Sequence, residues 1–101
     1  MEYGVRWSHL AIRDLLDIHD YTARHLHASS RPLVAKLFKG VQRLDIFPRS
    51  GRAVPGWEDP DWREVIVPPF RVIYRIEGRE VTISRVYHSR RSLPSHPDRF
   101  L

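Results

Sequence analysis

The sequence predicts an α+β fold in which an antiparallel sheet is covered on one face by a helical hairpin, with its elements in the order β-α-α-β-β-β. Residues 70–77 and 81–88 alternate between apolar and polar side chains, the period of two expected for half-buried strands. Two earlier segments carry apolar residues three and four apart, which is typical of amphipathic helices. Because 101 residues suffice for one two-layer core, we expect a single domain over residues 1–93 and a proline-containing tail over residues 94–101.

The two alternating segments predict a β-hairpin, because Gly78-Arg79 between them suits a two-residue turn. Glycine at the first central position fits a type II′ turn, which requires a positive φ there. With Glu77 opposite Glu80, one face is mostly apolar, and Arg85 is the exception on it. We expect Arg85 near the sheet edge, with its charge in water or paired with a carboxylate. The predicted pairs are Ile76–Val81, Tyr74–Ile83, Val72–Arg85 and Phe70–Tyr87 on the apolar face, and Arg75–Thr82, Ile73–Ser84 and Arg71–Val86 on the other.

The N-terminal half predicts one strand and two helices. Residues 2–7 form the strand, and Ser8 is a candidate N-cap for a helix that runs to about Leu26. A second helix begins after Ser30 and ends near Ile46. The expected apolar side of the first helix comprises Ala11, Ile12, Leu15, Leu16, Ile18 and Leu26.

The segment 48–60 reads as a loop, since it contains three prolines, two glycines and no periodicity. Residues 62–67 resume as a strand, and Pro68-Pro69 turns the chain into the hairpin. The tail is too rich in proline for a regular element. We therefore expect the sheet face opposite the helices, and the tail, to be exposed. Trp57 in the loop has two readings, a clasp for a partner or a side chain folded back onto the core.

The composition limits the classes of function. Seventeen Lys and Arg against twelve Asp and Glu give a net charge of +5, which is compatible with phosphate binding or with an acidic protein partner. The absence of cysteine, of a signal peptide and of a membrane-length apolar run predicts a cytoplasmic protein without membrane contact. The six histidines show no metal-ligand spacing, so we expect neither a metal nor a cofactor. Asp14, Asp17 and Asp20 are explained by a solvated helix face.

Three segments carry a family resemblance: LDIFPRSGR (44–52), WREVIVPPFRVIYRIEG (62–78) and VTISRVYHSRR (81–91). With the element order, they resemble the RelE/ParE superfamily of type II toxin–antitoxin toxins. Arg63 and the FRVIYRIEG run favour its ParE branch. The resemblance implies a cognate ParD-like antitoxin whose C-terminal segment wraps the toxin, with a groove between helices and sheet as a seat for an amphipathic antitoxin helix.

The resemblance implies two candidate activities. RelE-like members are ribosome-dependent mRNA endonucleases, whereas ParE-like members poison DNA gyrase by stalling it on cleaved DNA. Arg71 matches the first arginine of the RelE pattern, and Arg91 or Arg90 matches the second. Trp62 and Glu64 stand where that pattern has lysines, and no tyrosine follows Arg91. Since acid and base groups are missing, we predict a gyrase poison that binds its target and is not an enzyme.

An alternative function as a nuclease depends on His88. Some relatives use a histidine near the end of the last strand, and the predicted register puts His88 on the face of Arg71 and Arg75. The alternative is therefore a metal-independent endoribonuclease, acting on ribosome-bound mRNA, with Arg71, His88 and Arg91 as its site. A third reading, a basic RNA-binding domain outside any toxin system, has only charge in its favour. The candidate partner-binding or phosphate-binding residues are Arg63, Arg71, Arg75, Arg90 and Arg91; solvated arginines that protect a sheet from aggregation are the competing explanation.

Overall fold

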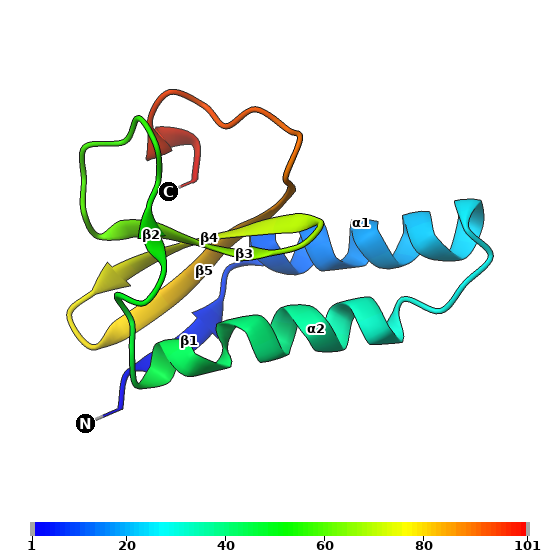
Figure 1. Ribbon diagram of the computed structural model, residues 1–101, viewed down its shortest axis with the longest axis horizontal. Helices are drawn as coiled ribbons and strands as arrows, with labels where there is room; N and C mark the ends of the chain where they lie inside the picture. The colour runs from blue at the N-terminus through cyan, green and yellow to red at the C-terminus, as the bar shows by residue number, and fades with distance from the viewer. Residues whose placement is uncertain (1, 101) are drawn as a thin grey trace.

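The computed structural model describes residues 2–100, apart from the side chains of residues 98 and 99. It contains a five-stranded sheet in the order β1-β5-β4-β3-β2, with two helices on one face (Figure 1). Neighbouring strands are antiparallel except β1 and β5, which are parallel. In chain order the elements are β1 (Gly4–Trp7), α1 (His9–His25), α2 (Arg31–Gln42), η1 (Arg43–Asp45), β2 (Arg52–Ala53), β3 (Trp62–Val67), β4 (Phe70–Glu77), β5 (Glu80–His88) and η2 (Pro97–Phe100). The predicted fold class is confirmed, and β2 is an addition within the predicted loop.

The helices begin and end close to the predicted positions. Ser8 caps α1, since its hydroxyl accepts a hydrogen bond from the Ala11 N–H at 3.1 Å. Ser30 precedes α2 as predicted, but its hydroxyl makes no capping bond and lies 2.6 Å from Nδ1 of His19. Gly40 allows α2 to approach β3, because a Cβ at this position would lie 2.5 Å from a methyl group of Val67.

The buried side of α1 is narrower than predicted. Ala11 is fully buried, but Ile12, Leu16 and Leu26 are 45%, 60% and 60% exposed. The sheet therefore covers only part of the apolar side of this helix. The first core cluster lies between the helices and the sheet and comprises Ala11, Leu37, Val41, Leu44, Val65, Val67, Phe70, Val72, Tyr74, Ile76, Val81, Ile83 and Val86.

The hairpin follows the predicted register only from the turn to Tyr74, which pairs with Ile83. Gly78 has a φ of +57°, as the predicted turn requires. Beyond Tyr74, Ile73 pairs with Arg85, which leaves Ser84 as an extra residue in β5 and forms a β-bulge. Because one extra residue reverses the faces of all that follow, the four predicted pairs Val72–Arg85, Phe70–Tyr87, Ile73–Ser84 and Arg71–Val86 are wrong. The observed pairs are Val72–Val86, Arg71–Tyr87 and Phe70–His88.

The sheet face opposite the helices is covered, which corrects the prediction that it is exposed. The loop after η1 and the C-terminal tail fold onto this face (Figure 1). Trp57 folds back, and its indole N–H donates to the Pro94 carbonyl at 2.9 Å. The bulge supplies Tyr87 to this face, where it meets Phe100 from η2. This second cluster comprises Val54, Trp57, Trp62, Ile73, Tyr87 and Phe100.

Across residues 2–100, neither helix combines the length and the apolar character that a membrane crossing requires.

Candidate functional site

A buried carboxylate joins two arginines on the second face. The Glu64 side chain on β3 is 0% exposed, and its Oε1 accepts bonds from Nε and Nη2 of Arg71 at 2.8 and 2.6 Å. Its Oε2 accepts a bond from Nε of Arg52 at 2.6 Å. Strand β2 brings Arg52 to this place, because Arg52 pairs with Glu64 across the two strands. The guanidinium of Arg71 is therefore already paired within the protein.

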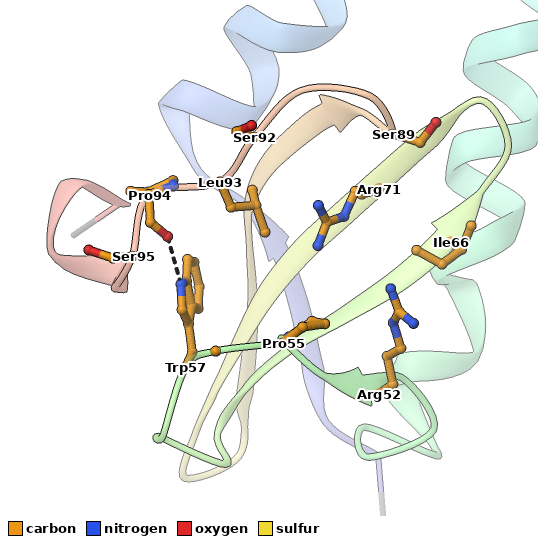
Figure 2. Close-up of a pocket in the computed structure, with 11 residues that line it drawn as sticks. Arg52, Pro55, Trp57, Ile66, Arg71, Ser89, Ser92, Leu93, Pro94 and Ser95 are labelled. Atoms are coloured by element: carbon orange, nitrogen blue, oxygen red, sulfur yellow. Dashed lines mark hydrogen bonds between the residues drawn. The ribbon is translucent and has the colours of Figure 1, made fainter.

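A pocket of about 740 Å³ lies beside the ion pairs of Glu64 with Arg52 and Arg71, and we call it the β3 pocket (Figure 2). Arg52 and Arg71 are the charged residues among those described that line it. The other lining residues are small or apolar and come from the loop, β3 and the tail: Pro55, Gly56, Trp57, Ile66, Ser89, Ser92, Leu93, Pro94 and Ser95. The pocket thus presents positive charge beside an apolar wall.

The other predicted arginines lie apart. Arg75 stacks over the Trp62 ring, 5.5 Å from its centroid, and lies 3.4 Å from Glu77. Arg63 lies on the helix-covered face, where it pairs with Tyr74. Its Nε donates to the Gly51 carbonyl at 3.0 Å, and its Nη1 donates to the Pro60 carbonyl at 2.9 Å. Arg63 therefore holds both ends of the loop.

The end of β5 places His88 of the alternative nuclease site on the face opposite Arg71. His88 is exposed and pairs with Phe70, whose side chain belongs to the first core cluster. The prediction that His88 shares a face with Arg71 and Arg75 is wrong, because the bulge at Ser84 reverses it. Arg91 stacks on Tyr87 at 4.2 Å, and the backbone N–H of the exposed Arg90 donates to Nδ1 of His88 at 3.2 Å.

A second groove, the α1 groove, has a volume of about 540 Å³. His88, on α1's side of the sheet, and Arg91, which stacks on Tyr87, both line this groove. Its apolar lining comprises Ile18, Tyr21, Leu26, Leu33, Pro69, Phe70 and Val86, and its charged and polar lining comprises Asp14, Asp17, Thr22, His88 and Arg91. It is the most apolar of the concave surfaces described here and suits an amphipathic partner.

Asp14 is a structural residue that the sequence reading missed. It accepts bonds from Nε and Nη2 of Arg85 at 2.9 and 3.0 Å and from the Val86 N–H at 2.8 Å. The hydrogen bonds to Asp14 raise the pKa of the Arg85 guanidinium, although burial opposes them. Strand β1 pairs with β5 only as far as Ile83, so the expected edge position of Arg85 and its pairing with a carboxylate are confirmed. The solvated-face explanation is wrong for Asp14, whose side chain is 11% exposed.

Tyr74 fixes the start of the loop. Its hydroxyl donates to the Pro48 carbonyl at 2.6 Å and accepts from the Gly51 N–H at 3.0 Å. Burial raises the pKa of Tyr74 above its ordinary value of 10.0. Among the site residues that sequence reasoning missed, Glu64 and Asp14 share one signal, a charged residue at a position where the pattern requires burial. Arg52 lies in a segment without periodicity and gives no such signal.

No cluster of three or more histidine, aspartate or glutamate side chains within the described part of the chain is arranged to hold a metal ion.

Several solved structures share the fold of this chain. A chain of the chromosomal ParDE toxin–antitoxin system from P. aeruginosa is 25% identical, with a TM-score of 0.69 over 85% of this chain and 95% of that one. A chain of the RelBE2 toxin–antitoxin complex from Mycobacterium tuberculosis is also 25% identical, with a TM-score of 0.61 over 87% and 99%. A chain of the E. coli DinJ–YafQ complex, 15% identical with a TM-score of 0.60 over 87% and 93%, shows the same fold.

The fold and these likenesses define a member of the RelE/ParE superfamily, as the sequence motifs predict. The family model described as the ParE toxin of the type II toxin–antitoxin system parDE matches residues 5–93. The chain therefore belongs to the ParE toxin family. No curated protein sequence matches it significantly.

Proposed function

We propose that this toxin poisons DNA gyrase and that a cognate ParD-like antitoxin neutralises it. Membership of the ParE family and the likeness to a chain of a ParDE system support both parts. The observation that carries the choice of target is the separation of Arg71 from His88 on opposite faces of the hairpin.

Metal-free RNA cleavage requires a general base and a cation at one phosphate. Arg71 already forms an ion pair with the buried Glu64, and His88 lines the α1 groove on the other side of the sheet. The RelE-like reading needs Arg71, His88 and Arg91 around a single phosphate group. This geometry favours a toxin that acts by binding.

The test is growth arrest caused by the His88→Ala variant when it is expressed without antitoxin. His88 is exposed, so the substitution leaves the fold intact, and His9→Ala on α1 is a matched exposed-histidine control. We expect both variants to arrest growth as the wild type does, with chromosome breaks and intact mRNA. Loss of arrest for His88→Ala alone, with restored mRNA, would establish the nuclease reading.

We further infer that an amphipathic helix of the antitoxin occupies the α1 groove. The groove is lined mainly by apolar side chains, and Leu26 and Tyr21 on its rim are 60% and 58% exposed. Contiguous exposed apolar surfaces, such as this lining together with its rim, mark interaction sites. A helix with apolar residues three and four positions apart would cover them.

A further inference from the structure

We propose that the β3 pocket binds an extended acidic segment of a partner protein, which pairs with the edge of β3 and places a carboxylate against Arg52 and Arg71. This inference goes beyond the proposed function, since it does not depend on gyrase.

The charges around the pocket favour an anion. Arg52 and Arg71 share the single carboxylate of Glu64, which leaves one positive charge unbalanced within this group. Arg52 uses its Nε for Glu64, and its two terminal amino groups have no partner among the described residues. Its side chain is 61% exposed, so these donors are accessible to a ligand. A carboxylate matches the planar guanidinium in geometry and charge.

The backbone beside the pocket is an open sheet edge. Strand β2 pairs only with Arg63 and Glu64, whereas β3 continues to Val67. The Asp61 carbonyl accepts from the Ile76 N–H of β4, so Asp61 and every second residue after it direct their backbone groups toward β4. Ile66 therefore directs its N–H and C=O outward, beyond the end of β2. An extended peptide can add to such an edge as a new strand.

The pocket wall favours a peptide over a nucleic acid. The side chains of Pro55, Leu93 and Ile66 provide aliphatic contacts (Figure 2). Trp57 is 7% exposed, so its ring face is not free to stack on a base. Because side chains alternate along an added strand, acidic residues two positions apart would face the arginines together.

The test is an NMR titration of the isotope-labelled full chain with a blocked pentapeptide, Val-Asp-Val-Asp-Val. We expect saturable shifts of the Ile66 amide and the Arg52 Nε–H signals. The matched peptide Val-Asn-Val-Asn-Val should bind about tenfold more weakly, because it lacks the charged acceptors. Equal binding of the two peptides would overturn the proposal.

Two pairs of variants test separately the charge of Arg52 and the open backbone edge of β3 at Ile66. Arg52→Gln should weaken binding of the Asp peptide about tenfold, whereas Arg49→Gln, similarly exposed but outside the pocket, should not. Ile66→Pro removes the outward N–H without breaking the ladder to β4 and should abolish binding, whereas Ile66→Ala keeps this N–H, removes only an aliphatic contact and should weaken binding less. Undiminished binding to Ile66→Pro, or tighter binding of a ten-nucleotide thymidine strand at the same residues, would overturn the proposal. Neither readout involves growth arrest or gyrase, so failure here is distinct from failure of the proposed function.

Discussion

At the residue scale, Tyr74 connects the first core cluster to the loop that covers the other face. Its ring is fully buried, and its hydroxyl bonds to backbone groups of Pro48 and Gly51. The sequence predicts a buried Tyr74 from its place in the alternation. It does not predict the two backbone partners, because they lie 26 and 23 residues away in a segment without periodicity.

Replacing Tyr74 with phenylalanine removes both bonds and leaves the buried Gly51 N–H and the partly buried Pro48 carbonyl without these partners. We expect the free energy of unfolding to fall by about 1–3 kcal/mol at pH 7, measured by urea denaturation. Because burial raises the pKa of the folded tyrosine above 10.0, the contribution of its neutral hydroxyl is fully present below pH 10 and is lost as the pH rises through the folded pKa. The difference between wild type and Tyr74→Phe should therefore shrink above about pH 10. A pH-independent difference would contradict this account.

Glu64 is the second residue on which stability depends. Glu64→Gln leaves Arg71, whose side chain is 15% exposed, without a charged partner. We expect a loss of about 3 kcal/mol in thermal or urea unfolding. Glu77→Gln is the matched control: Glu77 is 59% exposed and lies 3.4 Å from Arg75, so the change should stay below about 1 kcal/mol. Equal effects of the two substitutions would show that the Glu64 pairs contribute little.

At the scale of elements, the bulge in β5 explains the main errors of the sequence reading. A period of two predicts where a strand lies, but it cannot locate one inserted residue, since both halves of a bulged strand alternate normally. The only sign was Arg85 on a face predicted to be apolar. The bulge at Ser84 moves Arg85 to the other face and brings Val86 into the first core cluster.

Asp14 holds α1 against the bulged part of β5. Asp14→Ala would leave the Arg85 guanidinium, 17% exposed, without its carboxylate and the Val86 N–H without its acceptor. We expect a loss of about 3 kcal/mol in the free energy of unfolding, with increased hydrogen exchange at Val86. Asp20→Ala on the same helix removes an exposed pair with Arg24 and should cost less than about 0.5 kcal/mol. A similar small cost for Asp14→Ala would contradict the proposed tie between α1 and β5.

At the scale of the whole molecule, the sequence predicts the layer of helices on the sheet but not the cover on the opposite face. The helices and strands follow from periodicity and from caps such as Ser8. The cover depends on contacts between Trp57, Tyr87 and Phe100, which are far apart in the chain and belong to segments without a regular pattern. The predicted arginines lie apart for the same reason, since loop and bulge together determine which arginines meet.

Leu16 on α1 and Leu26, the C-cap residue of this helix, test where the antitoxin binds. Leu26 and Leu16 are both 60% exposed, but only Leu26 lines the α1 groove. We expect Leu26→Lys to weaken binding of the purified antitoxin by at least tenfold in calorimetric titration, because it puts a charge into an apolar interface. Leu16→Lys should change the affinity less than threefold, and thermal unfolding should show both variants folded. A larger effect at Leu16 would contradict binding in the α1 groove and would place the antitoxin on the outer side of the helices.

The measurement that bears most directly on the central claim is the yield of linear DNA when the purified toxin is added to bacterial gyrase, ATP and supercoiled plasmid, followed by detergent and protease. A gyrase poison predicts linear plasmid that increases with toxin concentration and disappears when antitoxin is added first. The same preparation should leave message on translating ribosomes uncut. Unbroken plasmid together with cleaved message would contradict the account and assign the toxin to the nuclease branch.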